Sequence, residues 1–140
     1  MKALYRTHAT AIGGRDGCAA SADRKLRVDF SKPRELDGTV GPGTSPEQLF
    51  ALGYAASLLS AIREAADRKQ VALTQDSNVT ATVAVGQEDE GHGLALEVAI
   101  NADLPGVDET TADRLVAEAL ELCPFSKAMR SNIAMRCSVG

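Results

Sequence analysis

The sequence predicts an α+β fold in which antiparallel sheets pack on one long, buried central helix. Alternating apolar and polar residues mark short segments that are typical of strands, and two segments have the apolar spacing of helices. Their order along the chain is βββ–α–ββ–α–β. Strands that come in groups, rather than alternating one by one with helices, favour a largely antiparallel arrangement.

Length and composition are those of an ordinary globular protein. The 140 residues predict a single domain, residues 1–140, with 44% apolar and 24% charged residues. The net charge of −4 argues against a nucleic-acid partner. The first residues lack the apolar stretch of a signal peptide, and the longest uncharged run, Gln48 to Ile62, is shorter than the roughly 20 residues that span a bilayer. We therefore expect a cytoplasmic protein with no membrane partner.

Three strands and a long loop are predicted ahead of the central helix. Residues 2–12, 18–22 and 25–30 alternate as strands. The Gly-Gly and Asp-Gly pairs of residues 13–17 are typical of a turn. A Gly- and Pro-rich loop then fills residues 31–44, and loops of that length are often functional.

The start of the central helix is clearly marked. Ser45 suits the N-cap, Pro46 the first helical position, and Gln48 completes a capping box. The helix is predicted to run to about Lys69. Because its first two-thirds are apolar on nearly every face, we expect that part to be buried.

The second half of the chain predicts a hairpin, two helices and a last strand. Asp108 suits the N-cap of the first of these helices. The predicted strands are 76–88, 94–103 and 131–138, and the predicted helices are 109–122 and 125–130.

Four stretches carry candidate chemistry: GGRDG at 13–17, GTSPEQLF at 43–50, GYAAS at 53–57 and CPFSKA at 123–128. With PRELDG at 33–38, and in this order, they resemble the organic hydroperoxide resistance (Ohr/OsmC) family over nearly the whole chain. The resemblance implies the OsmC-like fold and an intertwined homodimer. It also implies a thiol-dependent peroxidase that reduces organic hydroperoxides, alkyl or lipid, to alcohols.

The resemblance further implies a role for individual residues. In the family, one cysteine on the central helix attacks the peroxide and becomes a sulfenic acid, and a second resolves it as a disulfide. Cys123 matches the resolving cysteine, and Arg15 and Glu47 match the residues that assist the attack. The attacking position falls on Ser57. No metal or other cofactor is implied, and the reductant would be dihydrolipoamide or a lipoylated protein.

Serine at position 57 departs from the family pattern and removes the first chemical step. A thiol has a pKa of about 8.5, which a nearby guanidinium lowers, whereas a serine hydroxyl stays protonated near neutrality and forms no sulfenic acid. We therefore expect this chain to be an inactive form of the peroxidase. Two origins are open: an engineered substitution, or a natural relative without catalysis that binds or senses an apolar ligand in the same pocket.

Helix geometry adds an expectation that does not depend on the resemblance. Glu47 and Ser57 are ten residues apart on one predicted helix, about 15 Å of rise. A glutamate side chain does not bridge that distance. If the two residues share a site, they come from different subunits, which predicts a homodimer with two sites at its interface. Together with the roles that the resemblance implies, Glu47 is expected to hold Arg15 across that interface.

Phe50, Tyr54 and Leu58 are the predicted lining of an apolar substrate pocket. Plainer interpretations of the local sequence remain open. Ser57 on an apolar helix often bonds back to a carbonyl one turn earlier, and a cysteine such as Cys123 is often an inert buried thiol. A serine hydrolase is disfavoured, because GYAASLL is not the G-x-S-x-G motif.

Overall fold

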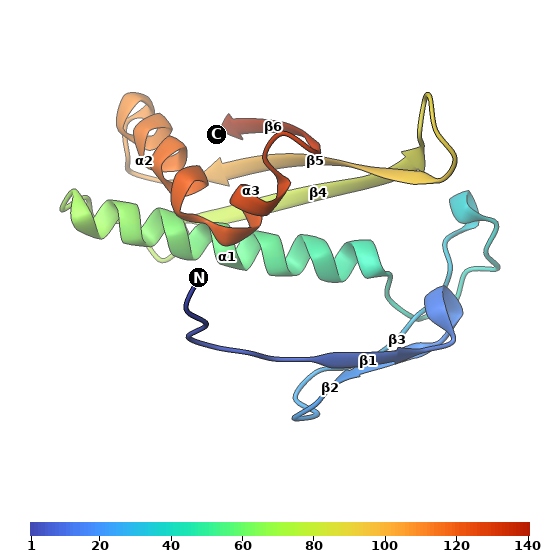
Figure 1. The fold of residues 1–140 in the computed structure, drawn as a ribbon. Helices are drawn as coiled ribbons and strands as arrows, with labels where there is room; N and C mark the ends of the chain where they lie inside the picture. The colour runs from blue at the N-terminus through green and yellow to red at the C-terminus, as the bar shows by residue number, and fades with distance from the viewer. The chain divides into compact units, whose positions relative to one another are not determined.

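The computed structural model describes residues 1–140, apart from the side chain of Ala134, and consists of two compact units, Met1–Leu49 and Phe50–Gly140 (Figure 1). Each unit contains a three-stranded sheet, and the long helix α1 (Pro46–Arg68) begins in the first unit and continues in the second. The α+β class predicted from the sequence is confirmed. The single domain stays a prediction.

The first unit is built on an antiparallel sheet of order β1-β2-β3. Its strands are β1 (Ala9–Ile12), β2 (Cys18–Ser21) and β3 (Arg27–Asp29). The predicted strand 2–12 is too long, because β2 offers partners to only four residues of β1. A short 3-10 helix, η2 (Arg34–Leu36), interrupts the loop that follows the sheet.

The predicted capping box opens α1. The Gln48 backbone N–H donates to Ser45 Oγ, and the Ser45 backbone N–H donates to Gln48 Oε1, both at 3.2 Å. One face of the helix is buried, and it comprises Tyr54, Leu58, Ala61, Ile62, Ala65 and Ala66. Leu52, on another face, stays 68% exposed. One chain by itself therefore covers one stripe of α1, and burial of its other apolar faces stays a prediction.

The second unit holds a sheet of order β4-β5-β6. Its elements are β4 (Asn78–Gln87), β5 (Leu94–Asp103), α2 (Glu109–Leu122), α3 (Pro124–Met129) and β6 (Ala134–Val139). β4 and β5 form the predicted antiparallel hairpin, but β6 runs parallel to β5. The largely antiparallel arrangement predicted from the sequence is confirmed. The β5–β6 pair is parallel because the crossover through α2 and α3 returns the chain in the same direction.

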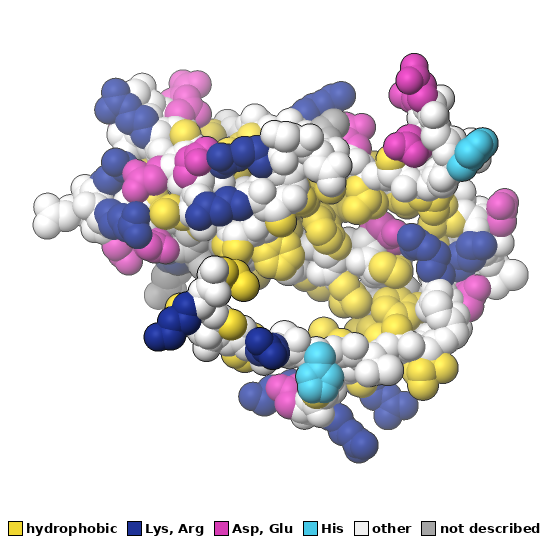
Figure 2. Space-filling model, viewed as in Figure 1, with side chains coloured by type: hydrophobic (Ala, Val, Ile, Leu, Met, Phe, Trp, Pro, Cys, Tyr) yellow, Lys and Arg dark blue, Asp and Glu magenta, His cyan; other side chains and the backbone are white. Residues whose placement is uncertain are grey.

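The core of the second unit joins α1, α2 and β5. Its largest fully buried side chains are Tyr54, Leu58, Ile62, Val98, Leu115 and Cys123. Among the described residues, α1 is the one helix long and apolar enough to cross a membrane by length and composition, but its buried stripe belongs to this core. Hydrophobic side chains also remain uncovered on the face shown in Figure 2.

Candidate functional site

A tight glycine turn presents Arg15. The residue lies in the 3-10 helix η1 (Gly14–Asp16), between β1 and β2. Gly13 has a φ of +77°, a left-handed conformation that other residues adopt at a cost. A Cβ at Gly17 would lie 1.7 Å from the Ile12 carbonyl oxygen, so no larger residue fits. The glycines therefore determine the loop shape that carries Arg15.

Arg15 and Glu47 form a bidentate ion pair within the first unit. Arg15 Nη2 lies 2.6 Å from Glu47 Oε1, and Nη1 donates to Oε2 at 2.8 Å. The hydrogen bond raises the pKa of Arg15 and lowers the pKa of Glu47, so both charges persist near neutrality. Because the pair forms inside one chain, the expectation that Glu47 reaches Arg15 across a subunit interface was wrong.

Asp16 has a structural role in the same turn. Its Oδ1 accepts a hydrogen bond from the Lys32 backbone N–H at 3.1 Å, which ties η1 to the segment after β3. This contact holds the C-terminal end of η1 in place. Asp16 is therefore a turn residue, and Arg15 is the member of the turn whose side chain is bound by a carboxylate.

Ser57 and Cys123 meet in the second unit. Ser57 Oγ lies 3.5 Å from Cys123 Sγ, and both side chains are at least partly buried. Ser60, one turn further along α1, bonds back to the Ala56 carbonyl oxygen at 2.9 Å. The hydroxyl of Ser57 instead faces the sulfur of Cys123. Each unit therefore contains one pair of the predicted site residues. Arg15 pairs with Glu47 in the first unit, and Ser57 contacts Cys123 in the second.

Cys123 lies between α2 and α3 and is fully buried. Burial acts to raise the pKa of its thiol. Hydrogen bonding to Ser57 and Ser126, together with the Phe125 backbone N–H, outweighs that effect and leaves the pKa of Cys123 below its ordinary value. These hydrogen bonds favour the thiolate of Cys123 in spite of its burial.

The predicted pocket residues have different environments. Tyr54 and Leu58 are fully buried in the core, so they do not line an open pocket in this chain. Phe50 is partly exposed and packs against Tyr54 and Phe125, with ring centroids 6.3 and 6.4 Å apart. Phe125 is 38% exposed. Sequence analysis missed Phe125, although an aromatic residue two positions after Cys123 was the available signal.

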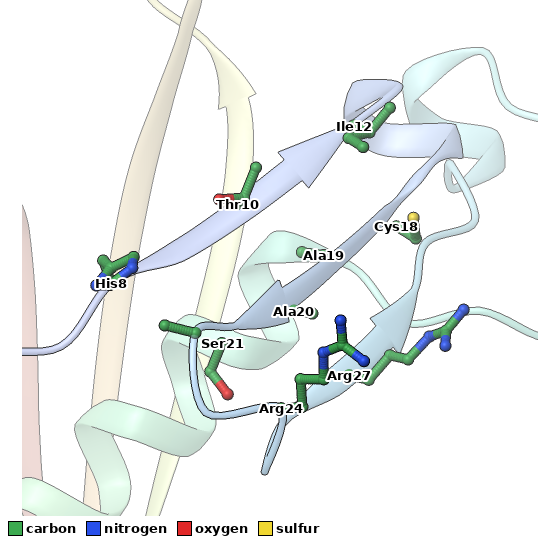
Figure 3. Close-up of a pocket in the computed structure, with 10 residues that line it drawn as sticks. His8, Thr10, Ile12, Cys18, Ala19, Ala20, Ser21, Arg24 and Arg27 are labelled. Atoms are coloured by element: carbon green, nitrogen blue, oxygen red, sulfur yellow. The ribbon is translucent and has the colours of Figure 1, made fainter.

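A separate cavity of about 490 Å³ lies against the sheet of the first unit (Figure 3). It is lined by residues including His8, Thr10, Ile12, Cys18, Arg24 and Arg27. None of the four predicted catalytic positions lines it. Among the described residues, no group of three or more His, Cys, Asp or Glu side chains is placed to hold a metal ion.

Comparison with known proteins identifies relatives over nearly the full length. A family model described as OsmC-like protein matches residues 37–138. The organic hydroperoxide resistance protein of Xanthomonas axonopodis pv. citri (strain 306) is 43% identical over 132 residues, which are 94% of this chain and 92% of that protein. The organic hydroperoxide resistance protein OhrA of Bacillus subtilis (strain 168) is 35% identical over 141 residues, 97% of this chain and 96% of that protein.

Solved structures show the same fold. The crystal structure of an organic hydroperoxide resistance protein OsmC from Legionella pneumophila superposes with a TM-score of 0.92 at 44% identity and covers 99% of both chains. A Vibrio cholerae structure, described as an organic hydroperoxide resistance protein with captopril bound in one of the active sites, gives a TM-score of 0.91 at 42% identity. It covers 99% of this chain and 94% of that one.

Proposed function

Because the chain belongs to the OsmC-like protein family, we propose that it has the scaffold of a thiol-dependent peroxidase for organic hydroperoxides, with Ser57 in the place of the attacking cysteine. The observation that supports this most directly is the 3.5 Å distance between Ser57 Oγ and Cys123 Sγ. A cysteine at position 57 would have its sulfur next to a second thiol, which is the arrangement that a two-cysteine peroxidase needs. The chain as it stands lacks the attacking thiolate.

The proposed reaction in a Ser57→Cys form has three steps. The thiolate at position 57 attacks the distal peroxide oxygen, the O–O bond breaks, and the alkoxide takes up a proton to leave as the alcohol. The Cys123 thiolate then attacks the sulfur of the sulfenic acid; an S–S bond forms, and hydroxide leaves and is protonated to water. A dithiol of the dihydrolipoamide class, free or carried by a lipoylated protein, reduces the disulfide by two exchanges.

Arg15 and Glu47 support the first step in this proposal. The Arg15 guanidinium would stabilise the thiolate and the negative charge that develops on the leaving oxygen. Glu47 would hold the guanidinium by its two hydrogen bonds. Neither residue donates electrons; both act by charge and position.

We propose a homodimer in which the Arg15–Glu47 pair of one chain meets the Ser57–Cys123 pair of the other. The rise of about 15 Å between Glu47 and Ser57 along one helix favours this mixed origin. The uncovered apolar side of α1, including Leu52, supplies surface that a second chain would bury. A cytoplasmic location remains part of the proposal.

The substrate class follows from the exposed aromatic surface. Phe50 and Phe125 keep part of their rings accessible near the start of α1, and both pack around Tyr54. Apolar rings of this kind favour an alkyl or lipid hydroperoxide over hydrogen peroxide, which offers no apolar surface to bury.

Ser57 itself favours a second candidate function, because a serine leaves the same apolar surface without peroxidase chemistry. In that case the chain would bind or sense an apolar ligand. The two candidate functions predict different results for Ser57→Cys. This substitution should restore peroxidase activity only if the chain has the scaffold of a peroxidase.

The deciding experiment follows the consumption of cumene hydroperoxide with dihydrolipoamide as reductant, for the chain as it stands, Ser57→Cys and Ser60→Cys. Ser60 is the matched control, because it lies on the same helix but bonds to its own backbone. Turnover by Ser57→Cys alone supports the peroxidase scaffold. No turnover by any form would reject it in favour of the ligand-binding candidate, and turnover by the unsubstituted chain would move the attack to another cysteine.

A further inference from the structure

Two contacts join α1 to the start of α3, and they form a matched pair. Tyr54 and Ser57 are three residues apart on α1, so they lie on one side of the helix. Cys123 and Ser126 are also three residues apart. The Tyr54 hydroxyl lies 3.0 Å from Ser126 Oγ, and Ser57 Oγ lies 3.5 Å from Cys123 Sγ. The first contact therefore holds the same two segments that the second brings together.

The Tyr54–Ser126 hydrogen bond is deeply buried. Tyr54 is 0% and Ser126 3% exposed, so neither hydroxyl has water as an alternative partner. Phe125 stacks on the Tyr54 ring with a centroid distance of 6.1 Å and an interplanar angle of 16°. Ser77 is also a buried serine, but its contact is with nearby Thr74. The bond to Tyr54 instead spans 72 residues of the chain.

We propose that Tyr54 and Ser126 are positioning residues for the step in which Cys123 forms a disulfide with a cysteine at position 57. This inference rests on the proposed function and names two residues that the resemblance did not assign. In that step the Cys123 thiolate attacks the sulfenic sulfur, the S–S bond forms and the S–O bond breaks. The buried hydrogen bond keeps the attacking sulfur at contact distance from residue 57.

The hydroxyl of Ser126 also has a direct effect on Cys123. It is among the groups whose hydrogen bonding keeps the pKa of Cys123 below its ordinary value. An ionised sulfur is a better acceptor than a phenol, so we expect Ser126 to donate to the thiolate and to accept from Tyr54 when Cys123 ionises. The alternative acceptor of the Tyr54 hydroxyl, Met135 Sδ, lies at 3.9 Å and is weaker. The Tyr54, Ser126 and Cys123 side chains would then form a hydrogen-bond relay that is oriented toward the Cys123 thiolate.

The test uses the Ser57→Cys protein and measures, in dithiothreitol buffers, the equilibrium of the disulfide between position 57 and Cys123, which needs no peroxide. Tyr54→Phe and Ser126→Ala each remove the hydrogen bond with little change in volume. We expect each to lower the equilibrium constant for disulfide formation by about 10-fold, because position contributes strongly to an intramolecular reaction. The double variant should be no worse than Ser126→Ala alone, since Tyr54→Phe removes only the bond that the two residues share.

Asp108→Ala is the control for a general loss of stability. Asp108 caps α2 by accepting from the Thr111 backbone N–H at 3.0 Å and touches neither sulfur position. This variant should leave the disulfide equilibrium within about 2-fold of the Ser57→Cys parent. Equal effects of Asp108→Ala and Ser126→Ala, or additive effects of Tyr54→Phe and Ser126→Ala, would overturn the positioning role.

A second readout uses the unsubstituted serine at position 57. Thiolate absorbance of a Cys18→Ser, Cys137→Ser form follows the ionisation of Cys123 alone. Ser126→Ala should raise that pKa, because a hydrogen bond to a charged group is lost. An unchanged pKa would contradict the relay. Both readouts hold even if Ser57→Cys reduces no hydroperoxide, so the failure of the proposed function would be distinguished from the failure of this inference.

Discussion

Ser57 Oγ lies 3.5 Å from Cys123 Sγ although 66 residues separate the two positions in the chain. The contact joins the middle of α1 to the junction between α2 and α3. It places the Ser57 hydroxyl next to the buried thiol of Cys123.

Ser57→Cys should form an intramolecular disulfide with Cys123 after one equivalent of cumene hydroperoxide. The two sulfur atoms would start near contact distance, and a disulfide needs only a small further approach. Intact-mass analysis after alkylation should show two of the four thiols protected. Ser60→Cys should leave Cys123 free, since residue 60 bonds to the Ala56 carbonyl instead. A disulfide in both variants would mean that α1 is too mobile for the observed contact to matter.

Glu47→Gln should destabilise the protein near neutrality by about 1 kcal/mol, because it removes one charge from a partly buried, bidentate pair. Arg15 lowers the pKa of Glu47, so this stabilisation is fully present above the unfolded carboxyl pKa of about 4.3. It is lost as the pH falls through the lower native value. Urea unfolding at several pH values should therefore show the variant and the parent converging in acid.

Glu64→Gln is the control for that measurement. Glu64 pairs with Arg68 on the same helix, but both side chains are more than half exposed. Its loss should change the free energy of unfolding by no more than a few tenths of a kcal/mol. If Glu64→Gln and Glu47→Gln behaved alike, the Arg15–Glu47 pair would be a solvated surface contact.

The sequence was sufficient for the parts of the fold that local chemistry determines. Ser45, Pro46 and Gln48 place the start of α1 correctly, and the β4–β5 hairpin follows from alternation. The direction of β6 was not predictable, because a strand pattern carries no direction relative to its neighbour. The sequence also did not show which stripe of α1 is buried. Apolar residues occur on nearly every face of this helix, and tertiary packing decides which of them are covered.

For the candidate site, too, the sequence indicated some features and left others open. It indicated which residues to consider but not which of them are in contact. Arg15, Glu47, Ser57 and Cys123 were found by resemblance, and the structure pairs them as Arg15–Glu47 and Ser57–Cys123. The sequence placed the first pair across an interface, because residues 32 positions apart carry no local sign that they meet. The contact between Ser126 and Tyr54 depends on how α1 packs against α3, so it was likewise not predictable from the sequence.

Gly17→Ala should damage the turn that carries Arg15 more than Gly14→Ala does. A Cβ at Gly17 would lie 1.7 Å from the Ile12 carbonyl oxygen, so the backbone must move. Gly14 has open space around a Cβ and a φ of +61°, which costs about 1 kcal/mol for alanine. Urea unfolding should give a loss above about 2 kcal/mol for Gly17→Ala. Similar losses for the two variants would show that the turn relaxes freely.

Leu52→Glu should convert the proposed dimer into monomers. Leu52 is 68% exposed in a single chain, on the part of α1 that is otherwise rich in apolar residues. Burying a glutamate against a second chain without a partner charge is unfavourable, so association should be lost while the core face of α1 is unaffected. Light scattering should report a mass of 14.7 kDa for this variant and twice that value for the parent.

Leu94→Glu is the matched control, because Leu94 is 52% exposed but lies at the start of β5, beside the polar turn of the hairpin. It should leave the dimer intact. In the Ser57→Cys background, Leu52→Glu should also abolish peroxide turnover, since each proposed site takes Arg15 from one chain and the thiols from the other. A monomeric Leu52→Glu protein that kept full turnover would show that one chain completes the site by itself.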